Sequence, residues 1–353
     1  MVTTPMDKRG YDGRKLASKG GTLDKQIAIQ RLDSHYLDAA IEMAVENYML
    51  ERRSTAGLSE GVNRNYFMKQ LEELFQRGTG RMAFVDNEPV GFLAFSEILT
   101  VDKSGTKGAT SPLFAYGIRH SKRGEIIGRL FQSVATELCE NFAQSLRVFV
   151  YAHDAEVLWT YLMSSFAMEM TGVVRDVSLP IEAEIPETCS LREIGHKELV
   201  DHKLEVIELY RALINHLRMS PVFYHCRQYL PVEKRFDDFL RDDLRVFALF
   251  DGGRLVGMVD SEPVGYGFAA HDQDALGMGD IFIAPGYREG GLAAALLKFA
   301  IDRLKIDGLR RLFVTHGTIN PTARGFWDKY FTNYSYSMTR KIDPDMLGSI
   351  KPV

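Results

Sequence analysis

Apolar positions along the chain recur with two different spacings. In residues 125–142 and 291–305 they return every three or four positions, as on one face of an α-helix. In "MAFVDNEPVGFLAF" from Met82 and "FALFDGGRLVGMVD" from Phe247, two short apolar runs flank a turn of Asp, Asn, Gly or Pro. That arrangement is typical of a β-hairpin. The pattern therefore predicts a mixture of helices and strands.

The predicted elements occur twice in the same order. Asp86 and Asp251 are 165 residues apart, and so are Arg123 and Arg288. Each copy is expected to run as a strand, two helices, a hairpin, a strand, a long helix, a strand, a short helix and a last strand. This constant offset indicates a tandem duplication. Two unrelated α/β domains with a similar rhythm are the alternative.

The expected elements of the first copy are a strand from residue 27, helices 35–54 and 64–77, a strand 113–119 and a helix 125–142. Those of the second copy are a strand from residue 189, helices 197–217 and 232–242, a strand 279–284 and a helix 291–305. Two prolines and three acids interrupt the pattern in "LPIEAEIPET" from Leu179. We therefore expect domains at 26–182 and 188–344, with a polar tail at 1–25 and a short tail at 345–353.

Composition narrows the class of protein. The 353 residues carry a net charge of −4, which argues against a nucleic-acid-binding protein. No apolar run reaches the roughly 18 residues of a membrane span, and the first 25 residues lack the apolar stretch of a signal peptide. The three cysteines, Cys139, Cys189 and Cys226, form no CxxC motif. We therefore expect a cytoplasmic protein without a disulfide framework or a zinc site.

The stretch "IFIAPGYREGGLAAALLKFA" from Ile281 predicts a strand, a basic turn and a helix. A helix start offers unpaired backbone N–H groups and suits an anion, above all phosphate. Gly290 and Gly291 let the backbone approach such a ligand, and Arg288 adds charge. The Lys-Ser or Lys-Thr of a nucleoside triphosphate site is missing. These residues favour a diphosphate that is bound without a metal.

These residues resemble a known family. Arg288, Gly291 and Ala293 fit the R/Q-x-x-G-x-G/A turn of the GCN5-related N-acetyltransferases (GNAT). "GDIFIAP" from Gly279 fits the strand before that turn, and "NPTARGFW" from Asn320 fits a later helix of the family. The resemblance covers about residues 26–343. It implies an α+β or α/β fold of two tandem GNAT-like domains, each a mixed, mostly antiparallel sheet flanked by helices.

The resemblance also implies acetyl-CoA as the cofactor. By the family pattern, the turn holds the pyrophosphate, backbone groups of the preceding strand meet the acetyl-pantetheine end, and Asn320 reaches the pantetheine. The residues expected to bind the cofactor are Phe282, Ile283, Arg288, Glu289, Gly290, Gly291, Leu292, Ala293 and Asn320. We predict no metal ligands. "HDQD" at 271–274 lacks a second ligand cluster, and "GYGFAA" at 265–270 is not followed by a predicted helix.

Acetyl transfer to an amine needs a base, because only the neutral amine attacks the thioester. Asp280, His316 and Glu262 are the candidates in the second copy, and a structural Asp or His is the alternative for the first two. The family's general acid corresponds to Tyr161 in the first copy but to Trp327 in the second. Since an indole cannot act as an acid, Tyr330, one helical turn later, is the substitute.

The two copies are expected to differ in function. Ile126 replaces Gly291, Ala115 replaces Asp280 and His120 replaces Pro285. A β-branched residue disfavours the positive φ of such a turn, so the cofactor turn is damaged in the first copy. Tyr161 is then better explained as a core residue than as a working acid. The insert 102–111 is expected to form a flexible hairpin extension, either over the substrate or on the surface.

The leading interpretation is an acetyl-CoA-dependent N-acyltransferase whose C-terminal half is catalytic. The acceptor would be a small-molecule amine or a peptide, and the acids around 271–280 mildly favour a cationic one. A non-catalytic acyl-CoA-binding protein is the first alternative, because Trp327 displaces the usual acid. A tRNA-dependent aminoacyl transferase is a weaker one, since the chain has no basic excess. Monomer and homodimer remain equally open.

Overall fold

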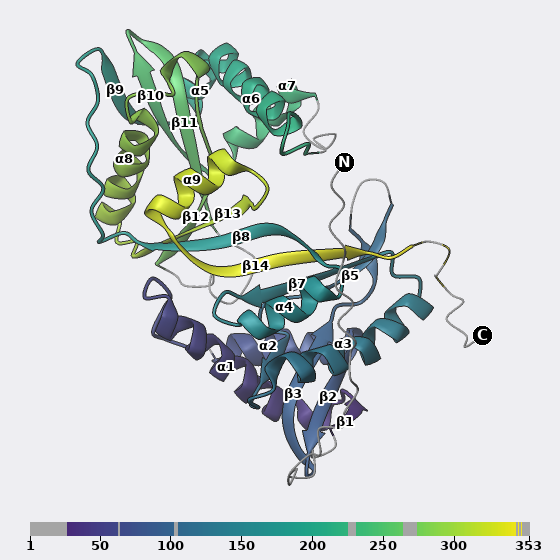
Figure 1. The fold of residues 1–353 in the computed structure, drawn as a ribbon. Coiled ribbons are helices and arrows are strands. Elements are labelled where there is room, and N and C mark those ends of the chain that lie inside the picture. The colour runs from purple at the N-terminus through teal and green to yellow at the C-terminus, as the bar shows by residue number, and fades with distance from the viewer. Residues whose placement is uncertain are drawn as a thin grey trace, which may run out of the picture.

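The computed structural model describes residues 27–62, 64–101, 105–224, 231–263, 274–343, 345 and 347. The expectations for the tail 1–25, for "GYGFAA", for His271–Gln273 and for most of the tail 345–353 lie outside these residues. Within them, two β-sheets and their flanking helices form an α+β fold (Figure 1). The predicted fold class is confirmed.

The first half of the chain contains β1 (Ala28–Arg31), α1 (Leu37–Ser54), α2 (Arg64–Arg77), β2 (Thr79–Val85), β3 (Glu88–Phe95), β4 (Leu99–Thr100), β5 (Lys107–Ser111), β6 (Tyr116–Ile118), α3 (Arg123–Glu140), β7 (Ser145–Tyr151), α4 (Ala155–Met163) and β8 (Ala167–Asp176). The second half contains β9 (Cys189–Ile194), α5 (His196–Asp201), α6 (Lys203–Arg218), α7 (Val232–Arg235), β10 (Arg245–Asp251), β11 (Arg254–Glu262), β12 (Ala275–Ile283), α8 (Leu292–Ile306), β13 (Arg311–Gly317), α9 (Pro321–Tyr330) and β14 (Thr332–Lys341). Short 3-10 turns occupy Ser34–Tyr36, Phe236–Leu240 and Pro285–Tyr287.

The two predicted hairpins form with tight two-residue turns. Asp86 and Asn87 connect β2 to β3 with φ of 53° and 66°, and Gly252 and Gly253 connect β10 to β11 with φ of 54° and 87°. Two consecutive positive φ values match the twist of the flanking strands, and Asp, Asn and Gly tolerate them best. The duplication is thus visible at the level of the turns.

The last strand of each half crosses into the sheet of the other half. The ten-stranded sheet has the order β4-β5-β7-β14-β8-β13-β12-β11-β10-β9, and a separate four-stranded sheet has the order β1-β2-β3-β6. β14 pairs with β7 of the first half, and β8 pairs with β13 of the second. β8 and β14 also pair with each other and run through the middle of the molecule (Figure 1). The domain boundary near 180–188 stays a prediction.

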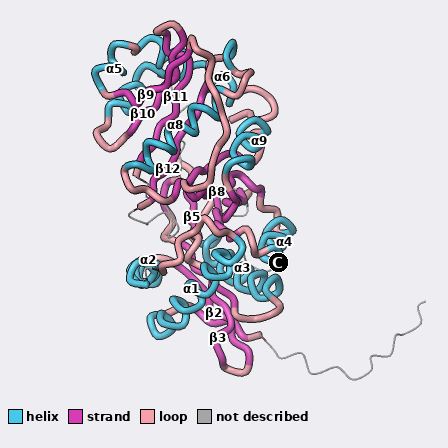
Figure 2. The backbone as a smooth tube through the Cα atoms, turned by 90° about the vertical axis from the view of Figure 1, so that its left-hand side faces the viewer, coloured by secondary structure: helices cyan, strands magenta, loops and turns pink. Residues whose placement is uncertain are grey.

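The hydrophobic core follows this arrangement. Helices α1, α2 and α3 lie around β2 and β3 at one end of the molecule, and α5, α6 and α8 lie around β9–β11 at the other, with β8 between them (Figure 2). The core of the first half also takes in Phe313, Tyr334 and Met338 from the second half. Val173, from β8, belongs to the core beneath α8. Apolar side chains therefore cross between the halves together with the strands.

Several elements differ from the sequence-based expectation. The helix expected at 197–217 is divided at His202 into α5 and α6, and the helix expected at 232–242 is only α7 followed by a 3-10 turn. The expected flexible insert is partly ordered sheet, because Lys107–Ser111 forms β5, which pairs in parallel with β7. Residues 102–104 of this insert lie outside the described part of the chain. Among the described residues, no helix has the length and apolar character to cross a membrane.

The exchange of strands predicts that neither half folds well alone. Fragment 27–182 lacks β13 and β14, so it leaves β7 paired only with β5 and β8 with no partner, and exposed strand edges promote aggregation. We expect each separately expressed half to aggregate or to melt without a cooperative transition. Co-expressed halves should associate and regain the circular dichroism spectrum of the full chain. A monomeric 27–182 fragment with a sharp thermal transition would contradict this prediction.

Candidate functional site

The candidate site begins where two parallel strands separate. β12 and β13 pair only from Ala275–Gly277 to Arg311–Phe313, and β13 then continues against β8 alone. On its other edge, β12 stays paired with β11 as far as Ile283. The edge of β12 that faces β13 therefore has no strand partner over Phe282 and Ile283, whose side chains are buried. An open strand edge of this kind can hydrogen-bond an extended ligand.

Beyond β12, the chain forms the predicted turn in front of a helix. Gly290 and Gly291 adopt φ of 85° and 79°, and α8 begins at Leu292. The first intrahelical bond is donated by Ala295 N to Gly291 O over 3.0 Å, and no side chain caps the helix. The N–H groups of the first turn are therefore available to an anion. A Cβ placed on either glycine would meet nothing within 4 Å, so the space in front of the helix is open.

Arg288 lies beside this helix start. Its Nε donates to Ile283 O over 3.2 Å, and its guanidinium lies 4.9 Å from the centre of the Phe282 ring. These contacts fix the side chain at the end of β12, where its positive charge adds to that of the helix dipole. Of the other residues predicted here, Glu289 is exposed, Ala293 is half-buried and the Leu292 side chain is buried. Leu292 can therefore contribute only its backbone.

Asn320 caps the next helix rather than pointing freely into the opening. Its Oδ1 accepts hydrogen bonds from Thr322 N over 3.2 Å and from Ala323 N over 3.3 Å, and the residue is buried. Asn is among the best N-cap residues because its oxygen satisfies such orphan donors. The oxygen is thus used by α9, and only the Nδ2 group remains to donate to a ligand.

Asp280 has a carboxylate neighbour that the sequence analysis did not select. A bulge between Val259 and Ser261 sets Asp260 of β11 opposite the Gly279–Asp280 pair of β12. A Cβ on Gly279 would lie only 2.0 Å from Asp260 Oδ2, so the glycine leaves the room that this carboxylate fills. Asp260 can be identified only from the register between β11 and β12, and the sequence does not reveal that register.

The two carboxylates differ in their electrostatics. Burial raises the pKa of Asp260 to about 7, helped by the negative charges of Asp280 and Glu262, while Arg235 lowers it. Asp280 is accessible to solvent, but the protein packed around it still raises the pKa of its carboxyl group by desolvation, against the positive charge of Arg235. A carboxylate with a pKa near 7 can accept a proton and release it at neutral pH.

Glu262 follows this pair on β11 and is engaged elsewhere. Its Oε2 accepts from Arg241 Nη1 over 2.9 Å at the surface. The structure therefore places Glu262 as a charge near Asp260 and not as a free base.

His316 lies on β13 beyond the point where the strands separate. It is buried, and its Nε2 lies 3.5 Å from Asp328 Oδ1 of α9. Neither ring nitrogen makes a well-formed hydrogen bond to another described residue. Burial lowers the pKa of the imidazole, although the Gly317 backbone and Asp328 oppose this shift. His316 is thus a buried imidazole next to a carboxylate on α9.

Trp327 and Tyr330 share the helix α9. Trp327 is buried and packs edge-on against Phe331 at 5.2 Å, so it belongs to the core beneath α8. Tyr330 is half-buried and packs against Phe326 at 5.3 Å. Tyr330 is therefore the only side chain of α9 (Pro321–Tyr330) with a phenol group.

The first half closes the corresponding place with its own side chains. Arg123, the counterpart of Arg288, donates from Nε to Asp154 Oδ1 over 2.9 Å and also bonds Asp154 Oδ2 and Asn47 Oδ1. Asp154 stands where Asn320 stands in the second half and is almost fully buried. The Arg123–Asp154 pair thus joins the start of α3 to the start of α4.

The helix start and the strand opening of the first half are also filled. α3 already begins at Arg123, so helix replaces the glycine turn, and Ile126 is completely buried. Between β6 and β7, Tyr151 N donates to Tyr116 Oη over 3.0 Å. Tyr161 is a core residue that packs against Phe131 and Phe166, and burial raises its pKa far above the ordinary value.

No cluster of three or more His, Cys, Asp or Glu side chains suited to a metal occurs among the residues that the structure describes.

Comparison with known proteins identifies a family pattern in part of the chain. Residues 210–331 match the family model described as the acetyltransferase (GNAT) family. Among curated protein sequences, none matches the chain significantly.

The fold is shared with a solved structure. A GCN5-related N-acetyltransferase from Sphaerobacter thermophilus superposes with a TM-score of 0.53 at 12% identity, over 89% of this chain and 95% of that one. A tandem GNAT protein from the clavulanic acid biosynthesis pathway is more distant, with a TM-score of 0.44 at 13% identity over 90% and 98% of the two chains. Residues 210–331 therefore carry the sequence pattern of the acetyltransferase (GNAT) family, and the chain shares the fold of the Sphaerobacter protein over most of its length.

Proposed function

We propose that the C-terminal half transfers an acetyl group from acetyl-CoA to the amine of a small molecule or peptide. The observation that carries this proposal is the uncapped start of α8 behind two left-handed glycines, directly beside the separation of β12 and β13. A diphosphate fits the free N–H groups and Arg288, and an extended arm fits the open edge of β12. The bound cofactor would supply an activated acetyl group.

The chain's own residues would then handle the acceptor and the protons. The Asp260–Asp280 pair attracts an ammonium group and takes its proton, with Asp260 as the main acceptor because its pKa lies near neutral. A backbone N–H at the open edge near Ile283 donates to the carbonyl oxygen that gains negative charge. Tyr330 returns a proton to the departing sulfur.

The first half would act as a wall and a source of strands rather than as a second catalytic unit. Its anion site is replaced by the Arg123–Asp154 pair, and its strand opening is bridged by Tyr116 and Tyr151. Non-catalytic binding of acyl-CoA is the second candidate, because Trp327 is buried in the place of the family's acid. Turnover of acetyl-CoA with a panel of amines separates the two functions.

The first prediction concerns the anion site. Gly291→Val places a β-branched residue at φ 79° and crowds the free N–H groups, which costs about 1–3 kcal/mol in strain alone. We expect this variant to lose the rise in melting temperature that acetyl-CoA produces. Gly128→Val is the matched control, because a Cβ at Gly128 makes only an ordinary contact at 3.5 Å. A shift that persists in the first variant and disappears in the control would reverse the assignment.

The second prediction separates the two arginines at the same position of the repeat. Arg288→Gln should raise the KM for acetyl-CoA and leave the fold intact, since Arg288 is exposed. Arg123→Gln should leave that KM unchanged but destabilise the fold by about 3–5 kcal/mol, because it strands the buried Asp154 charge. Denaturant unfolding and steady-state kinetics measure both quantities. The assignment is wrong if Arg123→Gln raises the KM as much as Arg288→Gln does.

The third prediction concerns the carboxylate pair. Asp260→Asn should lower kcat/KM by about 10²–10⁴ at neutral pH, the usual range for general base help. In the wild type, kcat/KM should rise with pH through about 7, because Asp260 must lose its proton to act. Asp280→Asn removes a negative charge that raises the pKa of Asp260, so the rise of kcat/KM should move to lower pH. If the rise of kcat/KM stays at the same pH in Asp280→Asn, and Asp260→Asn keeps full turnover, the general base is His316 instead.

Asp260 also makes a signed prediction about stability. Its folded-state pKa is raised, so the folded protein binds more protons than the unfolded chain between about pH 4 and pH 7. The contribution of Asp260 to stability is present at low pH and is lost as pH rises through 7. Asp260→Asn should therefore raise the melting temperature relative to wild type more at pH 8 than at pH 5. An equal difference at both values would show that Asp260 titrates normally.

A further inference from the structure

Helix α4 of the first half has an apolar outer face. Its Val157 and Tyr161 are buried, as expected for the side of a helix that packs on the rest of the protein. On its outer face, Trp159, Leu162 and Met163 are exposed to 63%, 41% and 69%. The solvent side of a surface helix is ordinarily polar. Adjacent large apolar side chains in that place mark a contact surface.

The duplication supplies an internal comparison for this face. Helix α9 is the counterpart of α4, and its buried Trp327 stands at the position of Tyr161. The residues of α9 at the three outer positions of α4 are exposed and not apolar: Gly325, Asp328 and Lys329. The same place in the fold is therefore polar in one copy and apolar in the other. The position of the helix does not require apolar residues, so a contact must account for them.

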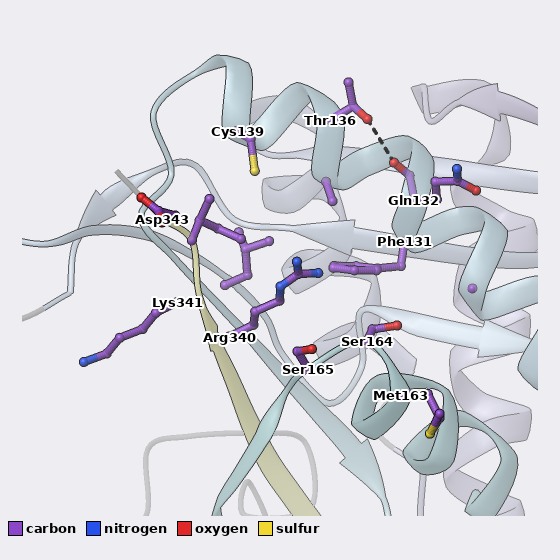
Figure 3. Close-up of a pocket in the computed structure, with 14 residues that line it drawn as sticks. Phe131, Gln132, Thr136, Cys139, Met163, Ser164, Ser165, Arg340, Lys341 and Asp343 are labelled. Atoms are coloured by element: carbon purple, nitrogen blue, oxygen red, sulfur yellow. Dashed lines mark hydrogen bonds between the residues drawn. The ribbon is translucent and has the colours of Figure 1, made fainter. Parts of the chain in front are cut away.

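A groove of about 820 Å³ opens beside the outer face of α4. It lies between α3, the end of α4 and the end of β14, and Met163 belongs to both the groove and the outer face (Figure 3). Phe131, Ala135, Cys139 and Leu146 supply its apolar lining. The groove and the outer face of α4 are therefore one continuous surface.

The second half fills the equivalent groove with its own chain. Val177 and Ile181, from the segment after β8, pack in the same core as three residues of α8: Leu296, Ala300 and Leu304. These three stand 165 positions after groove-lining residues of α3, namely Phe131, Ala135 and Cys139. In the described part of the chain, no residue takes the place of Ile181 in the groove of the first half. That groove therefore has room for an apolar side chain.

Arg340 of β14 gives the groove a charged group. It is half-buried and points towards Phe131, whereas Lys341 extends away from the other lining residues (Figure 3). Arg340 makes no hydrogen bond or ion pair to another residue within the described ranges. A guanidinium stacks on aromatic rings and pairs with carboxylates. The groove thus suits an aromatic side chain that is accompanied by an acidic one.

We propose that the groove and the outer face of α4 form the contact surface with a second copy of this chain. A two-fold contact is self-complementary, so each copy must carry both the docking residue and the place that receives it. Trp159 and Met163 are one helical turn apart. Antiparallel packing of the two α4 helices therefore places Trp159 of each copy opposite Met163 of the other, at the rim of the groove. Trp159 enters the groove and meets Phe131 and Arg340 there.

Charge complementarity favours a second copy as the partner. Glu156 is exposed and lies one turn before Trp159 on the same side of α4. Its Oε2 accepts from Gly124 N over 3.1 Å, which leaves Oε1 for a cation. In the antiparallel arrangement this carboxylate lies at the far end of the other α4, where Arg340 has unused donors. The surface thus contains both members of each pair, and this inference does not depend on the proposed catalytic function.

Sedimentation velocity of the full chain over a dilution series tests the proposal. We expect a dimer that dissociates on dilution. Trp159→Glu should raise the Kd of the dimer about thirtyfold or more, the scale of a central interface residue. Leu204→Glu is the matched control, because Leu204 is 75% exposed but lies on α6 of the second half. Its Kd should equal that of the wild type, and circular dichroism checks that each variant keeps its fold.

A charge exchange tests the arrangement of the two copies. Glu156→Arg and Arg340→Glu should each weaken the dimer, and the double variant should regain most of the lost affinity, because opposite charges again meet across the two-fold axis. Of the two tryptophans, Trp327 is already buried, so a blue shift of the emission on association reports burial of Trp159.

Two results would overturn the proposal. A full chain that stays monomeric over the whole dilution series would leave the outer face of α4 for a different macromolecule. A dimer that is as tight in Trp159→Glu as in the wild type would show that the two copies meet through another surface.

Discussion

Backbone pairing between β8 and β14 is the interaction on which the rest of the structure depends. Each is the last strand of one half, and each joins the sheet of the other half. A duplicated chain can bury two cores side by side, but here the hydrogen bonds of the central strands run across the repeat. Met338 of the second half therefore packs in the core of the first half, and Val173 of the first half packs in the core beneath α8. The two halves therefore stabilise each other through strands and not only through a surface contact.

This shared framework allows the two copies to diverge at their helix starts. In the second half, two left-handed glycines leave the N–H groups of α8 uncapped and the space before them open. In the first half, helix runs through the same positions, and a buried arginine–aspartate pair holds the neighbouring elements together. Removal of one partner of such a pair destabilises the fold, because the other charge is then buried without a partner. The first half thus has internal ion pairing where the second half has an open helix start, and it still supplies a strand to the other half.

The carboxylate pair and the arginine of β8 both depend on strand register for their surroundings. Asp260 acquires a pKa near neutral because a bulge and a missing Cβ on Gly279 bring it next to Asp280 in a desolvated place. Arg175 of β8 is buried and finds carbonyl acceptors at Leu179 and Pro180, in the segment that follows the strand. In both cases, chemistry arises from a neighbour in space whose position is set by strand register.

The sequence by itself determined the duplication, the order of the elements, the two hairpins and the glycine turn before α8. These features depend on local rules: apolar spacing, turn residues with positive φ, and the free N–H groups of a helix start. Only the tertiary structure decided that β8 and β14 change sides, that Lys107–Ser111 joins the sheet, and that Asp260 is a neighbour of Asp280. It also decided that the side-chain oxygen of Asn320 caps α9 and that Trp327 lies in the core. The reason is physical: strand partners and register are fixed by contacts between residues far apart in the chain, which hydrophobic spacing within one segment does not encode.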